Sequence, residues 1–325
     1  MEKESLRIIF MGTPEFAVAS LKALVKNNYN VVGVITMPDK PLGRGYQLQP
    51  SAVKQYALQQ GLTLLQPEKL KDETFLAALR ELQADLQIVV AFRMLPEVVW
   101  SMPPKGTFNL HSSLLPQYRG AAPINWAIIN GEKETGVTTF FLSHEIDTGK
   151  IIFREKTPIR ETDNAESMHD KLMVMGAALV LKTVDSVLND TVVSVPQQEM
   201  IEKESELKSA PKIFKETCRI DWGKSARELQ DFIRGLSPYP AAWTELHQSG
   251  SNKQLRIKLF ASEMIVGRTD NRPVGTITTD NKTFIDVAAR DGIIRITELQ
   301  LSGKKRMKTV EFLNGYSFPE EAHFS

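Results

Sequence analysis

The chain has 325 residues, of which 42% are hydrophobic, and its 40 Lys and Arg nearly balance its 39 Asp and Glu. These values are ordinary for globular proteins and exclude a collagenous, coiled-coil or disordered chain. The single cysteine excludes a disulfide framework and a cysteine-rich zinc site, and it favours a reducing compartment. The N-terminus is polar and the apolar runs are only as long as strands, so we predict a cytoplasmic protein with no membrane partner. At roughly 150 residues per domain, the length predicts two domains.

Strands and helices alternate along the first part of the chain. We predict strands over 6–10, 30–36, 63–65, 86–91, 107–111, 137–142 and 150–153, and helices over 16–24, 51–60, 73–83 and 164–189. The succession of strand, helix and strand predicts an α/β domain with a mostly parallel sheet. We expect Thr13 to be the N-cap of the first helix, with Pro14 at its first position. The segment from Thr36 to Pro50 is rich in proline and glycine, which predicts a long loop rather than helix or sheet.

The pattern changes near residue 190. Residues 192–211 lack periodicity and are interpreted as a linker. A helix over 226–235 and short strand-like runs separated by turn residues predict a small β-barrel or sandwich after it. Residues 207–325 contain 19 basic and 14 acidic residues. Lys304, Lys305 and Arg306 form a local basic cluster, for which a solvated face and a nucleic-acid contact are competing interpretations.

The first glycine turn gives little support to a dinucleotide site. Gly12 is followed by Pro14 and Ala17, where the dinucleotide fingerprint has further glycines. The chain also lacks the Gly-Lys-Ser/Thr signature of a phosphate-binding loop. An ordinary tight turn is therefore the better interpretation of Gly12, and a nicotinamide-dependent oxidoreductase is a weak alternative.

The densest polar signal surrounds a strand that ends at His111. Asn109 and His111 are two residues apart and therefore share one face of that strand. Asp147 precedes a Thr-Gly pair, which is first of all the composition of a turn, and its single copy argues against an aspartic protease. If Asp147 faces His111, the amide would stabilise an oxyanion, the imidazole would move protons, and the carboxylate would fix the imidazole tautomer. His144 is an alternative to His111 in this site.

The absence of nucleophile and metal-binding motifs limits the reactions that these polar residues can catalyse. It contains no Gly-x-Ser-x-Gly nucleophile elbow and no histidine or cysteine spacing typical of a metal site. The polar residues therefore predict acyl-group transfer between two bound substrates, without a metal and without a covalent enzyme intermediate.

Several motifs together resemble one family. They are the run 109–120 (NLHSSLLPQYRG), the turn 147–149 (DTG), and the segments 11–16 (MGTPEF), 38–45 (PDKPLGRG), 219–222 (RIDW), 238–243 (PYPAAW) and 303–305 (GKK). This set is similar to the methionyl-tRNA formyltransferase family and extends over nearly the whole chain. The strand and turn motifs are shared with other enzymes that use formyltetrahydrofolate, whereas the Gly-Arg-Gly loop and the C-terminal motifs are specific to the tRNA enzymes. The chain departs from the family over 91–96: where the family has Ala-Tyr-Gly before a Leu-Pro, this chain has Ala91-Phe92-Arg93-Met94-Leu95-Pro96, one residue shorter.

The resemblance implies a fold and an activity. The fold would be a Rossmann-like catalytic domain (1–190), a linker (191–208) and a small C-terminal barrel similar to an OB fold (209–325). The activity would be formyl transfer from N10-formyltetrahydrofolate to the α-amino group of methionine on initiator tRNA. We expect a monomer that carries no metal.

The resemblance also implies roles for individual residues. Asn109, His111 and Asp147 would be catalytic. The folate would bind at the motif Ser113, Leu114, Leu115 and Pro116. The tRNA would contact Arg44 and Lys40 in the first long loop, and Lys304, Lys305 and Arg306 in the barrel.

Two further alternatives remain open. A formyltransferase that acts on a nucleotide-linked sugar or a purine precursor would share the same catalytic motifs, although the Arg44 loop and the basic barrel argue against it. A tRNA-binding module with an inactive pocket is opposed by the intact Asn109, His111 and Asp147.

Overall fold

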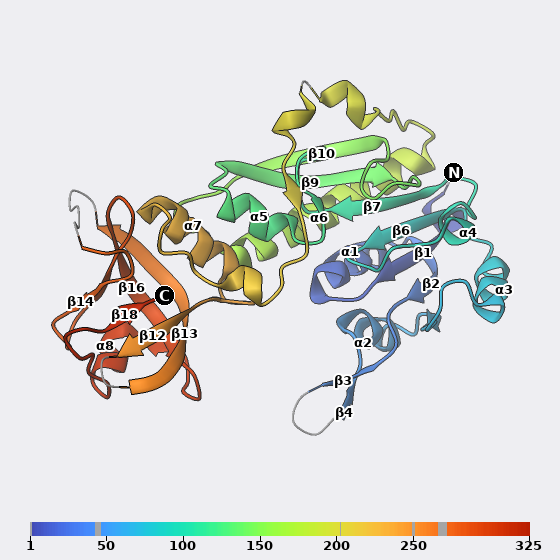
Figure 1. Cartoon of the computed structure of the whole chain (residues 1–325). Helices are drawn as coiled ribbons and strands as arrows, with labels where there is room; N and C mark the ends of the chain where they lie inside the picture. Colours follow the sequence, from blue (N-terminus) through green and yellow to red (C-terminus); the bar gives the residue numbers. More distant parts are fainter. Residues whose placement is uncertain (1, 43–46, 202, 249–250, 266–271) are drawn as a thin grey trace. The chain divides into compact units, whose positions relative to one another are not determined.

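The computed structural model describes residues 2–42, 47–201, 203–248, 251–265 and 272–325. Contacts within the chain divide it into two compact units (Figure 1). Unit 1 comprises Met1–Gly120, Thr135–Thr157 and His169–Ser209, and unit 2 comprises Ala121–Glu134, Pro158–Met168 and Ala210–Ser325. The two units therefore interleave along the sequence, and the domain boundaries at residues 190 and 209 stay a prediction.

The helices and strands follow the predicted order closely. Up to residue 210 they are η1 (Lys3–Ser5), β1 (Arg7–Gly12), α1 (Glu15–Lys26), β2 (Asn30–Ile35), β3 (Lys40–Leu42), β4 (Gln47–Gln49), α2 (Ala52–Gln59), β5 (Leu64–Leu65), α3 (Glu73–Glu81), β6 (Leu86–Val90), α4 (Glu97–Trp100), β7 (Thr107–His111), β8 (Arg119–Gly120), α5 (Pro123–Ile129), β9 (Glu134–Phe141), β10 (Ile151–Pro158), α6 (Ala165–Leu188), η2 (Gln197–Met200), η3 (Glu204–Glu206) and β11 (Ser209–Ala210). After residue 210 they are η4 (Glu216–Cys218), α7 (Ala226–Leu236), β12 (Ala242–Gln248), β13 (Ser251–Ile265), β14 (Ile277–Thr279), β15 (Ile285–Ala288), β16 (Ile293–Leu301), β17 (Met307–Lys308), α8 (Thr309–Leu313) and β18 (His323–Phe324). None of the helices in the described ranges combines the length and apolar character needed to cross a bilayer.

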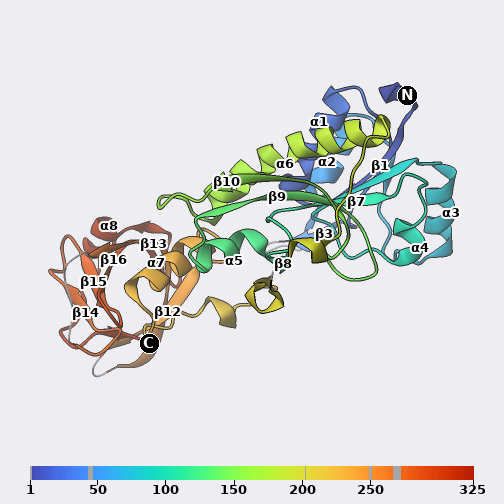
Figure 2. The same cartoon turned by 90° about the horizontal axis from the view of Figure 1, so that it is seen from above.

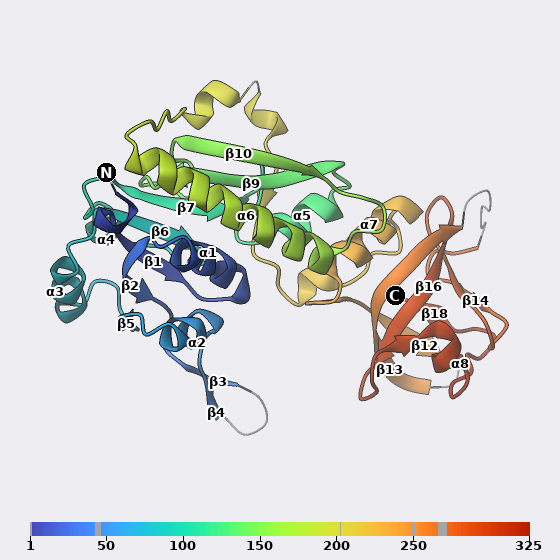
Figure 3. The ribbon, with the colours of Figure 1, turned by 180° about the vertical axis from the view of Figure 1, so that it is seen from behind.

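Unit 1 is built on a sheet with the order β10-β9-β7-β6-β1-β2-β5. Neighbouring strands from β5 to β7 are parallel, and β9 is antiparallel to β7. The apolar runs of the central strands pack on both faces, as is typical of parallel sheets. Helices α1 and α6 lie along one face (Figures 2 and 3), and apolar residues of α3 and α4 join Ile9, Met11 and Val89 in a core on the other. The predicted α/β fold with a mostly parallel sheet is confirmed.

Two local predictions in unit 1 are wrong. Helix α1 begins at Glu15, with Pro14 rather than Thr13 at the N-cap. The Thr13 hydroxyl is buried and makes no hydrogen bond to any described residue, while the Thr13 carbonyl accepts from the Val53 N–H at 3.4 Å. Extended backbone at Pro14 (ψ 175°) places the start of the helix one residue later than the composition suggested.

The segment 36–50 is not structureless. Strands β3 and β4 form a short antiparallel ribbon in which Pro41 is opposite Leu48. Both strands of a two-stranded ribbon are edges, so a proline is tolerated there, and the prediction from proline content failed for this reason. Residues 43–46, and with them the predicted tRNA residue Arg44, lie outside the described residues.

Unit 2 contains a nearly closed antiparallel sheet. Its strand order is β14-β15-β16-β13-β12-β18, with β17 paired to β16. An isolated bridge between Thr276 and His323 brings the two ends of this order together. At that junction Gly275 has φ +82°, and a Cβ there would lie 2.2 Å from the Phe324 carbonyl oxygen, so the closure requires glycine. The predicted small β-barrel is confirmed.

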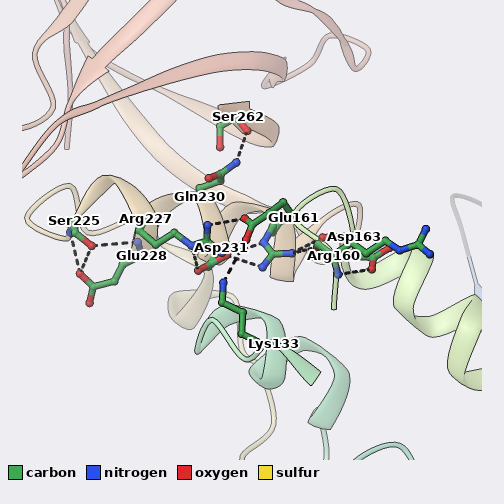
Figure 4. Close-up of polar contacts among 11 residues, drawn as sticks. Lys133, Arg160, Glu161, Asp163, Ser225, Arg227, Glu228, Gln230, Asp231 and Ser262 are labelled. Atoms are coloured by element: carbon green, nitrogen blue, oxygen red, sulfur yellow. Dashed lines mark hydrogen bonds and ion pairs between the residues drawn. The ribbon is translucent and has the colours of Figure 1, made fainter. Parts of the chain in front are cut away.

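Helix α7 in unit 2 carries a dense set of ion pairs, which we call the α7 charge network (Figure 4). The buried Asp231 carboxylate accepts from Arg227 at 2.9 Å and from Arg234 at 2.7 Å. Arg227 also donates to Glu161, and this contact lowers the pKa of the Glu161 carboxyl to about 2. Arg234 donates further to the carbonyl oxygens of residues 160 and 163. Every charge in the network therefore has a protein partner.

Candidate active site

Asn109 and His111 lie on one face of β7 at the carboxyl end of the parallel strands. Leu110, between them, faces α6, where a Cβ on Gly176 would lie 2.6 Å from the Leu110 side chain. Because side chains alternate along a strand, Asn109 and His111 point to the opposite face. Asn109 is half-buried, and its carboxamide makes no hydrogen bond to any residue that the structure describes. Its donors are therefore available to a ligand.

The His111 ring is fixed by the backbone of the following loop. Its Nε2 lies 2.8 Å from the Tyr118 carbonyl oxygen. A carbonyl oxygen only accepts, so Nε2 carries the hydrogen and the Nδ1 of the neutral ring has a free lone pair. This Nδ1 faces the Asp147 carboxylate, with 3.9 Å between Nδ1 and Oδ2. Asp147 therefore faces His111, which is the condition that the sequence left open, although the main orienting contact of the imidazole is Tyr118 rather than the carboxylate.

Asp147 is presented by a constrained turn. The residue has φ +56°, in the left-handed region. Its Oδ2 accepts the Gly120 N–H at 2.9 Å, which stabilises the charged carboxylate. Two residues on, a Cβ on Gly149 would lie 1.6 Å from the Phe141 carbonyl oxygen, so this turn can approach β9 only with glycine. The Asp-Thr-Gly composition thus serves both the turn and the position of the carboxylate.

The other histidine considered from the sequence lies elsewhere. His144 is exposed and pairs with Glu97, with 3.6 Å between Nε2 and Oε1, and its ring is edge-on to Trp100. Of the two histidines, the structure therefore brings His111 to Asp147.

The predicted folate motif follows β7 directly. The Ser113 hydroxyl is fully buried and donates to the Gln117 carbonyl at 2.7 Å. Leu115 is also fully buried and packs with Phe140 and Ile151. Pro116 is buried as well, which leaves Leu114 and the backbone as the parts of the motif that can meet a ligand. A role in folate binding stays a prediction for Ser113, Leu114, Leu115 and Pro116.

The predicted tRNA residues that the structure describes differ in their surroundings. Lys40 is exposed on β3. Lys304 and Lys305 are exposed, and their ammonium groups have no partner in the described part of the chain. Arg306 instead forms two hydrogen bonds to Glu298, at 2.8 and 2.7 Å, and lies over the Phe260 ring. Its charge is therefore already compensated within the protein.

The ribbon that carries Lys40 is anchored at its base. Asp39 accepts from Lys54 at 2.6 Å and from Gln66 at 3.0 Å. The Lys54 contact lowers the pKa of the Asp39 carboxyl, so the anchor is ionised at neutral pH. No local sequence pattern predicts this anchor, because its three side chains come from separate segments of the chain.

The sequence also missed the residues that support the site. Tyr118 acts through its backbone carbonyl, which no side-chain pattern can reveal. Gln197 is fully buried and contacts the backbone of the Asp147 turn, although its segment was interpreted as a linker. When a polar residue lies in a segment without periodicity, no local sequence pattern predicts that it is buried.

The arrangement combines an amide donor that no described residue uses, an imidazole with a lone pair on Nδ1 and a carboxylate. Such a set can polarise a carbonyl group and remove a proton from an attacking amine. In the ranges that the structure describes, no group of three or more histidine, cysteine or acidic side chains is placed to hold a metal ion.

Comparison with known proteins finds formyltransferases that match nearly the whole chain. A Formyl transferase family model matches residues 6–184, and a Formyl transferase, C-terminal domain model matches residues 212–317. The chain is 64% identical to the methionyl-tRNA formyltransferase of Parabacteroides distasonis, with 97% of each chain covered. It is 50% identical to that of Porphyromonas gingivalis, with 99% of each covered.

Solved structures share the fold at lower identity. The N-formyltransferase from Helicobacter canadensis, in complex with folinic acid and dTDP-3-aminofucose, matches with a TM-score of 0.62 at 20% identity, covering 93% of this chain and 100% of that one. HypX from Aquifex aeolicus, in complex with tetrahydrofolic acid, matches with a TM-score of 0.62 at 19% identity, covering 95% of this chain and 47% of that one. The full-length identities and the two family matches establish that this chain belongs to the methionyl-tRNA formyltransferase family.

Proposed function

We propose that the chain transfers the formyl group of N10-formyltetrahydrofolate to the α-amino group of methionine on initiator tRNA, for translation initiation. The observation that carries the chemistry is the meeting of His111 and Asp147 beside the carboxamide of Asn109, which has no hydrogen-bond partner among the described residues. The observation that carries the substrate is the family, which the chain matches over nearly its whole length. We expect the enzyme to act in the cytoplasm as a monomer.

The site fits a formyl donor because it offers a hydrogen-bond donor to a carbonyl oxygen. The folate substrate supplies an activated formyl group whose leaving nitrogen is attached to an aryl ring. Asn109 donates to the formyl oxygen, where negative charge develops as the amine attacks. One such donor lowers the barrier by about 3–4 kcal/mol.

Proton movement falls to the imidazole and the carboxylate. Nδ1 of His111 and the Asp147 carboxylate face one another, so both can accept the proton that the attacking amine loses. As the new C–N bond forms and the bond to the folate nitrogen breaks, the leaving nitrogen gains a proton. The site also holds two substrates together, an effect that can reach ~7–11 kcal/mol.

The tRNA contacts extend this proposal to both units. Lys40 and Arg44, from the segment 38–45, would meet the acceptor end, and Lys304, Lys305 and Arg306 would meet phosphates. The ammonium groups of Lys304 and Lys305, which pair with none of the residues that the structure describes, support the second part, whereas Arg306 would have to share its charge with Glu298.

The experiment is a formyl-transfer assay with the purified full chain. We expect formylmethionyl-tRNA from N10-formyltetrahydrofolate and charged initiator tRNA, and little product with charged elongator methionine tRNA. A dTDP-linked amino sugar serves as the alternative acceptor. Faster transfer to the sugar, or binding of the tRNA without any turnover, would contradict the proposal.

A further inference from the structure

Gln197 connects the segment after α6 to the turn that carries Asp147. Its side-chain Nε2 donates to two backbone carbonyl oxygens of the turn, at 2.8 Å to Asp147 and 2.9 Å to Gly149. Its Oε1 accepts two hydrogen bonds from the Arg119 guanidinium, at 3.0 and 2.6 Å. The side chain is fully buried and lies within unit 1. Both donor hydrogens of the amide, and its acceptor, are therefore in use.

Only a carboxamide of this length both donates to the two turn carbonyls and accepts from the Arg119 guanidinium. A carboxylate would accept from Arg119 but would place oxygen against the two turn carbonyls. A hydrocarbon side chain would leave two carbonyls and a guanidinium without partners, which is costly when they are buried. The four hydrogen bonds therefore depend on the amide group of Gln197 and not on the volume of its side chain.

The neighbouring residues link this amide to the rest of the site. Tyr118, Arg119 and Gly120 are consecutive, and each makes one of the supporting contacts. The Tyr118 carbonyl orients the His111 ring, Arg119 holds Gln197, and the Gly120 N–H binds the Asp147 carboxylate. A shift of the Asp147 turn would therefore change its distance both from Gly120 and from the His111 ring.

We propose that Gln197, held by Arg119, is a positioning residue that fixes the backbone of the Asp147 turn, so that the carboxylate remains opposite Nδ1 of His111. This inference rests on the proposed function for its catalytic consequence, and it adds residues that lie outside the predicted catalytic trio. The turn needs such a support because Asp147 adopts a left-handed conformation that non-glycine residues rarely occupy.

The first test compares Gln197→Met with Gln197→Glu in the full chain. Both should lower kcat by on the order of 10- to 100-fold, the loss expected when a catalytic group moves by about 1 Å. The KM values for formylfolate and tRNA should stay unchanged, because Gln197 is buried away from solvent. Gln117→Met is the matched control: this glutamine also bridges backbone groups, at Glu206 and Lys208, but does not contact the Asp147 turn. The control should retain the wild-type kcat.

The second test asks whether Gln197 acts through Asp147. In an Asp147→Asn background, Gln197→Met should cause no further loss of kcat, because the group that it positions is already disabled. A loss that persists in this background, or a wild-type kcat in the single variant, would overturn the proposal. If Gln197→Met fails to fold, Arg119→Met provides the same comparison from the partly exposed end of the pair.

A third measurement does not depend on activity. Hydrogen exchange of the Gly120 amide reports whether its bond to the Asp147 carboxylate persists. We expect faster exchange at Gly120 in Gln197→Met than in wild type, and no change in Gln117→Met. Unchanged protection would overturn the positioning role even if the proposed function holds. Conversely, absence of formyl transfer in wild type, together with faster Gly120 exchange in the variant, would contradict the proposed function alone.

Discussion

The site at the end of β7 and the α7 charge network are both rich in polar groups, yet they use them differently. In the network, Asp231 and Arg234 are nearly fully buried and each makes several hydrogen bonds within the protein. At the site, the Asn109 carboxamide has no partner among the described residues, and 3.9 Å separates His111 from Asp147. Groups that stabilise the fold have their hydrogen-bond partners within the chain, whereas the groups proposed to perform the chemistry are held in place but keep donors and acceptors that the described residues do not use.

The largest effect is expected from breaking the network. Asp231→Ala should lower the free energy of unfolding by about 3–5 kcal/mol, because it leaves the buried Arg234 charge without its carboxylate. Chemical denaturation measures this change, and the folded fraction should retain the wild-type kcat. Asp170→Ala is the control, since its side chain is 65% exposed and should alter stability little. An equally small effect at Asp231 would remove the contrast between the two regions.

The opposite pattern is expected at the site. Asn109→Ala should reduce kcat about 10²- to 10³-fold, because a donor to the developing oxyanion is lost. Its effect on folate affinity and on the unfolding free energy should be small, since the carboxamide makes no hydrogen bond within the described chain. Steady-state kinetics with initiator tRNA and a folate-binding titration check this. A large loss of stability with little loss of turnover would show that Asn109 belongs with the structural groups.

A smaller effect, on tRNA binding, is expected to distinguish Lys304 and Lys305 on the barrel from Arg306, whose charge is compensated by Glu298. Lys304→Ala and Lys305→Ala should each weaken tRNA binding and reduce the slope of log affinity against log salt by about one. Arg306→Ala should change the slope less, because Glu298 already compensates its charge. Binding titrations over a range of salt concentrations measure the slopes. Equal slopes for the three variants would contradict this ranking.

The smallest effect concerns the exposed rim of the network. The pKa of Glu161 falls from 4.5 to about 2 in the folded protein, mainly through its hydrogen bond with Arg227. A lowered folded-state pKa gives stability above the unfolded pKa, and this stability is lost as pH falls from about 4.5 towards 2. Because the Glu161 side chain is 60% exposed, we expect Glu161→Gln to cost less than about 1 kcal/mol at neutral pH. The difference from wild type should vanish below pH 2 and shrink in high salt, and a constant difference would exclude this ion pair as its source.

The sequence allowed prediction of those parts of the molecule that depend on local pattern. Periodicity and spacing predicted the apolar strands, the long helix α6, the barrel, and the shared face of Asn109 and His111. The β3–β4 ribbon and the N-cap of α1 were missed because composition does not decide between close backbone alternatives. The support of Asp147 by Gln197 was missed because it joins residues 50 apart in the chain, and the orientation of His111 depends on a backbone carbonyl.

The central claim is that His111 and Asp147 act together on the formyl group. The most direct measurement is the single-turnover rate of formyl transfer, at saturating formylfolate and charged initiator tRNA, for His111→Ala, Asp147→Asn and the double variant. If the two groups form one unit, each single variant loses most of the rate and the double variant is no slower than the slower single one. Losses that multiply in the double variant, or a single variant that retains the wild-type rate, would contradict the claim.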